Sequence, residues 1–172
     1  MPMFHLAFKC EPMEKGAAGI RTEMVADLAA EALFGESSEL YLKLYEEGLI
    51  DSSFGGGFET IDGCAMLMCS GDSENAAAVR EAILHQAAKI AKEGIPEQNF
   101  LRMKRSALGR RIRSLDSFDA TCFRVCAYHF SGFDYFRFPE IYRSIEATEI
   151  QGFLNRVVQP ERCSLSVINP LS

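Results

Sequence analysis

The sequence lacks several features that define whole classes of protein. It has no run of about 18 apolar residues, the length that a membrane-spanning helix needs. Its first residues lack the basic start, apolar stretch and small-residue cleavage site of a secretion signal. Basic residues are in deficit, because 18 Lys and Arg stand against 24 Asp and Glu, and binding to nucleic acid or to an anionic membrane needs the opposite balance. We therefore expect a cytoplasmic protein that binds neither nucleic acid nor a membrane.

Paired metal-binding residues are also missing. None of the six cysteines forms a CxxC pair, and in a chain of 172 residues with 48% apolar content we expect reduced, mostly buried thiols rather than a disulfide framework. None of the three histidines has a second histidine four residues away, so the sequence contains neither HExxH nor HxxEH. The sequence therefore offers no zinc peptidase motif, and its length predicts one domain over residues 1–172.

What the sequence does contain is a succession of strand and helix patterns. Alternating apolar and polar residues predict strands at 3–10, 50–61, 62–71 and 162–170, the middle two forming a hairpin. Helical spacing predicts helices at 21–35, 37–48, 72–94, 96–115, 117–132, 138–145 and 147–158. Ser37 or Ser38 is expected to cap the second helix, and Thr148 the last. This order predicts an α+β fold, with a mainly antiparallel sheet packed on one side by paired helices.

Three consecutive glycines, Gly55 to Gly57, stand out within the second predicted strand. A phosphate-binding loop would need a helix directly after the glycines, and its common form also needs a lysine. Neither follows here, because the pattern continues as a strand. Glycine in a strand marks a bulge or a close approach of another part of the backbone. We therefore interpret these glycines as part of a sheet edge that bends or faces a partner.

One group of possible metal ligands lies on a predicted helix. Cys122, Cys126 and His129 are spaced four and three residues apart, which places them on one helix face. Zinc accepts thiolate and imidazole ligands, but a site needs a fourth ligand or an open position, and the neighbouring residues supply no ligand. The favoured interpretation is a buried face of small thiols beside one hydrogen-bonded histidine.

A basic run occupies residues 102–113. It could contact RNA or DNA, or it could be the solvated face of a long helix that forms salt bridges to the acidic remainder of the chain. No aromatic residues interleave with the basic ones, as stacking on bases would require. The second interpretation is therefore favoured.

Four phrases of the sequence carry a resemblance to a known family. They are SSELYLKLYEEGLIDSSFGGGF, GCAMLMCSG, IPEQNFLRMKRSALG and EATEIQGFLNRVVQPERCSLSVINP. Together they resemble the C-terminal repeat of the insulinase-like, pitrilysin-type zinc metallopeptidases, which include the mitochondrial processing peptidase. The first phrase is most similar to the bacterial cytoplasmic subgroup. The resemblance spans nearly the whole chain.

The resemblance implies a particular role. Members of this family consist of two similar halves that enclose a chamber for peptides, and only one half carries HxxEH and zinc. This sequence resembles the other half, which implies no catalytic residue and no cofactor of its own. The implied partner is a zinc-bearing half, on the same polypeptide or as a separate subunit, and the implied substrate is a peptide. Two alternatives remain open: a Cys/His metal-binding module, and an interaction or structural domain of peptidase ancestry.

The resemblance also concerns individual positions. In many members of the family this half supplies an Arg and a Tyr to the active site, and here those positions hold Tyr45 and Asp51. Neither can replace the original residue, because tyrosine carries no fixed charge and a carboxylate would repel a developing oxyanion. The sequence therefore predicts that this half takes no direct part in catalysis. We expect it to hold the peptide by strand addition at Phe54, Gly55, Gly56, Gly57 and Phe58.

Overall fold

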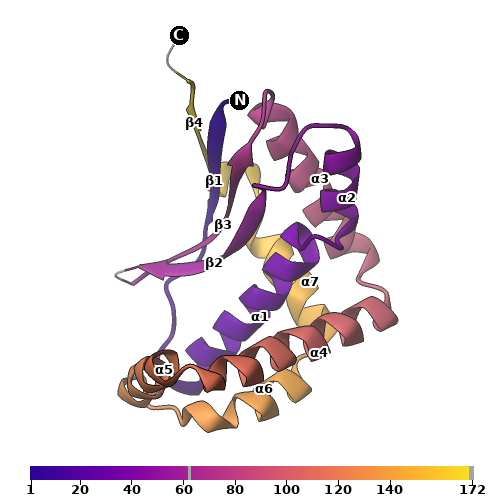
Figure 1. Ribbon diagram of the computed structural model, residues 1–172. Helices are drawn as coiled ribbons and strands as arrows, with labels where there is room; N and C mark the ends of the chain where they lie inside the picture. The colour runs from indigo at the N-terminus through magenta and orange to yellow at the C-terminus, as the bar shows by residue number, and fades with distance from the viewer. Residues whose placement is uncertain (62, 171–172) are drawn as a thin grey trace.

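The computed structural model describes residues 1–61 and 63–170, and four strands within them form one antiparallel sheet. The order across the sheet is β2-β3-β1-β4 (Figure 1). The strands are β1 (Met3–Lys9), β2 (Gly55–Ile61), β3 (Cys64–Asp72) and β4 (Cys163–Ile168). β2 is therefore an edge strand, as the sequence indicated for the glycine segment.

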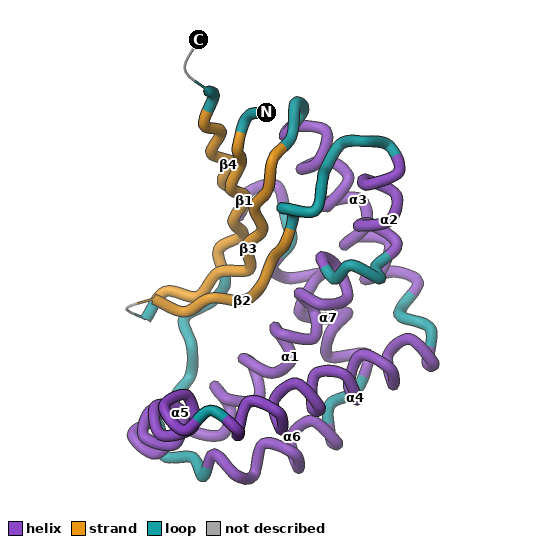
Figure 2. Tube along the Cα trace, in the orientation of Figure 1, coloured by secondary structure: helices purple, strands orange, loops and turns teal. Residues whose placement is uncertain are grey.

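Helices lie on one side of this sheet (Figures 1 and 2). They are α1 (Gly16–Phe34), α2 (Glu39–Glu46), α3 (Ala76–Glu93), α4 (Glu97–Arg113), α5 (Phe118–Phe130), α6 (Phe138–Ser144) and α7 (Ala147–Val157). In the view of Figure 1, α4, α5 and α6 lie below the sheet, at the end of α1 that is farther from it. The predicted α+β fold is confirmed. None of the helices within residues 1–61 and 63–170 has the length and apolar character of a membrane span.

The core lies between the sheet and these helices. Phe4, Leu6 and Phe8 of β1 are fully buried, while the residues between them are exposed or half-buried. Since successive side chains of a strand point to opposite faces, only one face of the sheet is covered. Met24 and Leu28 of α1 are fully buried on the same side. Burial of this apolar face drives the packing of helices on the sheet.

The predicted hairpin is confirmed. β2 and β3 pair continuously, from Gly55 opposite Ser70 to Ile61 opposite Cys64. Asp62, which lies where the two predicted strands meet, is outside the described residues. Residues 50–54, predicted as strand, instead form the loop that leads from α2 to β2.

Two predicted helix starts need correction. α1 begins at Gly16 rather than at Arg21, because the alanines that follow Gly16 favour a helix. α7 is capped by Glu146 and not by Thr148. The Glu146 side chain accepts the backbone N–H of Glu149, and the Glu149 side chain accepts the backbone N–H of Glu146 at 2.9 Å. This reciprocal pair is a capping box with glutamate in the first position. The cap predicted at Ser38 is confirmed.

Candidate functional site

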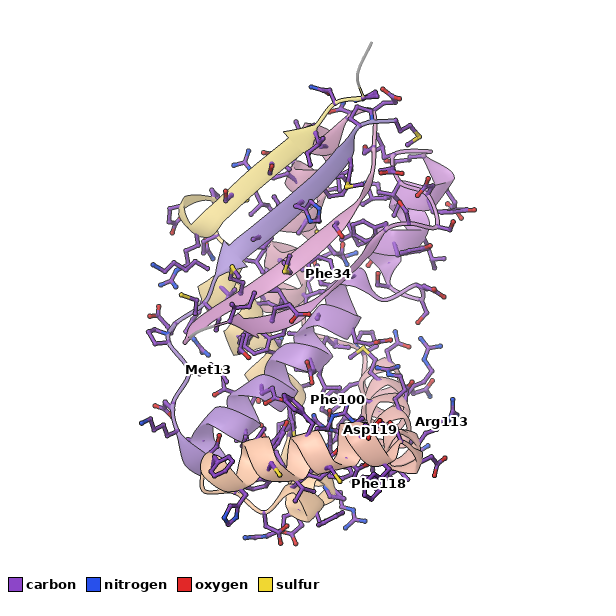
Figure 3. All side chains as sticks on the ribbon, turned by 60° about the vertical axis from the view of Figure 1, so that its left-hand side comes forward. Met13, Phe34, Phe100, Arg113, Phe118 and Asp119 are labelled. Atoms are coloured by element: carbon purple, nitrogen blue, oxygen red, sulfur yellow. The ribbon has the colours of Figure 1, made fainter. Side chains whose placement is uncertain are left out.

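The edge strand β2 lies close to the C-terminal end of α1. A Cβ atom added to Gly56 would lie 2.5 Å from Cδ2 of Phe34 and 2.7 Å from the carbonyl oxygen of Met68, whereas Gly55 and Gly57 face open space. Figure 3 shows Phe34 beside the strands. The continuous register of β2 excludes a bulge. Of the three glycines, only Gly56 must therefore be a glycine, because only there would a side chain collide with its neighbours.

A cleft of about 700 Å³ opens beside β2. Its walls come from α1, β2, α4, α5, Ser114 between α4 and α5, and Tyr142 of α6. The lining residues are Glu23, Asp27, Ala30, Glu31, Gly35, Gly56, Gly57, Phe58, Glu59, Thr60, Ala107, Arg110, Arg111, Ser114, Phe123, Arg124, Ala127, Tyr128 and Tyr142. Gly56, Gly57 and Phe58, three of the residues singled out in the sequence, therefore border a cleft.

Arg111 organises one wall of this cleft. Its side chain is only 11% exposed, and Nη2 donates to Glu23 Oε1 at 3.1 Å and to the hydroxyl of Tyr128. The Tyr128 hydroxyl in turn donates to Glu23, and Nη1 of Arg111 lies 3.7 Å from Asp27 Oδ2. The guanidinium carbon also lies 5.6, 5.9 and 6.0 Å from the ring centres of Tyr128, Tyr135 and Phe138. One cation thus joins α1, α4 and α5 through ion pairs and aromatic contacts.

Asp27 is the least compensated carboxylate in this network. Burial is the main cause that raises its pKa to about 6, and the nearby charge of Glu23 raises it as well, while Arg111 and Arg110 lower it. Because the folded-state pKa exceeds that of a free carboxyl group, protonated Asp27 favours the fold at low pH. This contribution is lost as the pH rises through about 6. At neutral pH the cleft therefore holds a carboxylate that a further cation would stabilise.

The basic run contributes to the cleft mainly through salt bridges. Arg110 pairs with Glu31 at 2.9 Å, and Arg111 pairs with acidic residues of α1. Lys104 donates to the backbone carbonyls of Arg143 and Ile145. The favoured interpretation of this run, salt bridges to the acidic remainder, is thus confirmed for Arg110 and Arg111.

Sequence reasoning missed the network around Arg111. A signal was present, because Glu23, Asp27 and Glu31 recur every fourth residue and therefore lie along one side of α1. No local pattern pairs this row with one particular arginine of the basic run.

Tyr45 and Asp51 lie outside the cleft lining. Tyr45 is half exposed on α2 and stacks on Tyr41 at 5.9 Å between ring centres. Asp51 accepts the backbone N–H of Ser53 at 2.8 Å, and hydrogen bonds from the Ser53 hydroxyl and backbone lower the pKa of its carboxyl. Phe54 is buried in the core, so only its backbone could meet a bound peptide. Asp51 therefore shapes the loop that leads into β2.

Cys122, Cys126 and His129 lie on the exposed face of α5. The expectation that this face is buried is wrong, because α5 packs inward through Tyr128, on its opposite side. The expectation of mostly buried thiols is also wrong: of the six free cysteines, only Cys10 and Cys69 are buried. Across residues 1–61 and 63–170, no group of three or more His, Cys, Asp or Glu side chains is placed to hold a metal ion.

The fold and the cleft define an α+β domain whose sheet is covered by helices on one face and whose free strand edge borders an open cleft. The family described as the peptidase M16 inactive domain matches residues 1–107. The chain belongs to this family. The resemblance to the non-catalytic half of insulinase-like zinc metallopeptidases, inferred from the four sequence phrases, is thus confirmed.

Known proteins agree with this assignment. The chain is 24% identical over 161 residues to the zinc protease YmfH of Bacillus subtilis, covering 94% of this chain and 37% of that protein. A protein described as an M16-like peptidase from Alicyclobacillus acidocaldarius has the same fold, with a TM-score of 0.87 and 20% identity over 96% of this chain and 40% of the other. A protein described as the inactive peptidase domain of a zinc protease from Bordetella parapertussis gives a TM-score of 0.80 and 15% identity, over 99% and 93% of the two chains. This chain therefore spans about two fifths of the length of YmfH and of the Alicyclobacillus protein.

Proposed function

We propose that this chain is the non-catalytic half of a zinc metallopeptidase, and that it packs on a zinc-bearing half to form the wall of a peptide chamber. The observation that carries the proposal is the open cleft beside the free edge of β2, in a domain of the M16 inactive family. The rest of the length of YmfH is more than enough for a second half. That half can lie on the same polypeptide or on a separate subunit.

Zinc is expected in the partner half. Zinc held there would supply the activation of water that hydrolysis of a peptide bond needs. In the part of this chain that the structure describes, no set of side chains fits zinc. This half therefore contributes no metal-dependent step and acts by binding and orienting the peptide.

The surface of α5 supports the need for a partner. Phe118, Phe123 and Phe130 are 79%, 75% and 88% exposed. Phe118 lies near Arg113, where α4 passes into α5 (Figure 3). Apolar side chains gathered on one exposed helix face mark contact with another domain or chain. Since Phe123 also lines the cleft, a partner on this face would border the proposed peptide site.

The proposed binding mode is strand addition at β2. Within residues 1–61 and 63–170 β2 pairs only with β3, so the N–H and C=O groups of its other edge are free to pair with an extended peptide. Gly55 and Gly57 have open space around them, which lets a second backbone approach. The cleft then accommodates the side chains of that peptide.

Proline in β2 tests this mode. Gly57→Pro and Thr60→Pro remove N–H groups that point to opposite edges of the strand, because the two residues are an odd number of positions apart. Loss of the N–H that pairs with β3 should lower the melting temperature. The variant that keeps the wild-type melting temperature is therefore the one that has lost the N–H on the free edge. In the assembly with the zinc-bearing half, that variant should raise KM about fivefold and leave kcat unchanged, since one backbone hydrogen bond is worth about 1 kcal/mol. If peptide cleavage is unchanged in both variants, strand addition at β2 is wrong.

A further inference from the structure

The cleft lies alongside β2, so a peptide paired with β2 would extend along the cleft. At one end Gly56 lies against Phe34 of α1, and toward the other end the charge of Glu59 acts on Asp27. α1 therefore runs alongside β2, and a strand added to the free edge of β2 would lie next to Glu23, Asp27 and Glu31. Alternate residues of a strand are about 6.8 Å apart, and every fourth residue of a helix about 6 Å. The side chains of the peptide that point into the cleft would thus meet this acidic row at nearly matching intervals.

The four carboxylates of the cleft are unequally compensated. Glu23 pairs with Arg111 and Glu31 pairs with Arg110. Asp27 lies 3.7 Å from Arg111, whose hydrogen bonds go to other groups, and Glu59 has no ion pair among the residues that the structure covers.

The opposite wall of the cleft has the other sign. Arg124 of α5 donates to the neutral hydroxyl of Ser114 at 2.6 Å. The side of the cleft next to β2 is therefore negative, and the side next to α5 is positive.

We propose that the cleft selects extended peptides that carry a lysine or arginine side chain, which pairs with Asp27 while the peptide backbone pairs with the free edge of β2. This inference rests on the proposed function and adds the class of side chain that the site accepts. The free strand edge and the cleft hold the peptide, and the charge complementarity decides which side chain fits. Arg124 repels a basic side chain from the α5 wall and so favours its position next to β2.

Short capped peptides test the selection on the isolated 172-residue chain. Three nine-residue peptides, acetylated and amidated so that their ends carry no charge, differ only in a central lysine, norleucine or glutamate. Binding is followed by fluorescence anisotropy of a labelled peptide at low salt and pH 7.5. We expect the lysine peptide to bind about tenfold more tightly than the norleucine peptide, and the glutamate peptide to bind most weakly. Equal affinities for the three peptides, or a preference for glutamate, would overturn the inference.

Two variants locate the effect in the cleft. Asp27→Asn should remove most of the preference for lysine over norleucine, and Glu59→Gln, at an exposed position, should reduce it without affecting folding. Glu46→Gln is the matched control, because Glu46 is exposed on α2 and lies outside the cleft lining. A preference that survives in Asp27→Asn, or that falls equally in Glu46→Gln, would contradict a role for Asp27.

N-methylation of the peptide separates this inference from the proposed function. Two versions of the lysine peptide are made, one methylated on the odd-numbered backbone nitrogens and the other on the even-numbered ones. Strand addition requires that one version loses binding while the other keeps it. If this asymmetry appears without a preference for lysine, strand addition holds and the charge selection fails. If no peptide binds, or if both versions bind equally, strand addition fails as well.

Discussion

Arg111→Met is expected to lower the free energy of unfolding by about 3 kcal/mol, because removing one partner of a mostly buried ion pair leaves the other charge uncompensated. The loss would leave Glu23 and Asp27, one helical turn apart, without the guanidinium that lies between α1 and α5. It would also remove the hydrogen bond to the Tyr128 hydroxyl. Urea denaturation at pH 8 measures the change.

Arg105→Met is the matched control for this prediction. Arg105 lies on the same helix, is exposed, and forms no salt bridge within the described residues. Its substitution should change the stability by less than about 0.5 kcal/mol, as is usual for surface positions. The destabilisation by Arg111→Met should also shrink at pH 4, where Asp27 with its pKa of about 6 is protonated. An Arg111→Met protein as stable as the wild type at pH 8 would show that the network does not hold α4 and α5 on α1.

Gly56→Ala is expected to lower the free energy of unfolding by about 2 to 3 kcal/mol, the usual cost of forcing an extra methyl group into a packed region. The new Cβ would lie 2.5 Å from Phe34 Cδ2, 2.7 Å from the Met68 carbonyl oxygen and 2.8 Å from the Cβ of Cys69. Two of these neighbours belong to β3, whose pairing with β2 fixes their distance from Gly56. Thermal and urea denaturation measure the loss.

The neighbouring glycines provide the control. Gly55→Ala and Gly57→Ala add a methyl group in open space, and neither glycine has a positive φ. These substitutions should be neutral or should stabilise the domain by about 0.5 kcal/mol, because alanine restricts the unfolded chain. Equal effects of alanine at the three positions would contradict a specific contact between β2 and α1.

The fold was largely predictable because its elements have strong local patterns. The alternation in β1 and the apolar spacing of α3 each indicate one buried face, which the structure confirms at Phe4, Leu6 and Ile83. The start of α7 was not predictable to the residue, since Glu146 and Thr148 can both cap a helix and the choice depends on the reciprocal bond with Glu149. The exposure of α5 was not predictable either. Its cysteines and phenylalanines have the composition of a core helix, and only the tertiary arrangement leaves them on the surface.

The candidate site was only partly predictable. The glycine segment in a strand indicated a sheet edge, and the structure places that edge beside a cleft. The opposite wall comes from residues about fifty to eighty positions later in the chain, including Arg111 and Tyr128. A single sequence contains no local signal for such a pairing. The cleft therefore emerges only when α1, β2, α4 and α5 are placed together.

Peptide hydrolysis should be measured with the purified chain, with and without added zinc, and in combination with a zinc-bearing half that contains HxxEH. A quenched fluorescent peptide with a central lysine serves as substrate in each case. We expect no turnover by this chain alone, whether or not zinc is present, and turnover when the zinc-bearing half is added. Zinc-dependent turnover by this chain alone would contradict the claim that this half binds the peptide while the chemistry takes place in its partner.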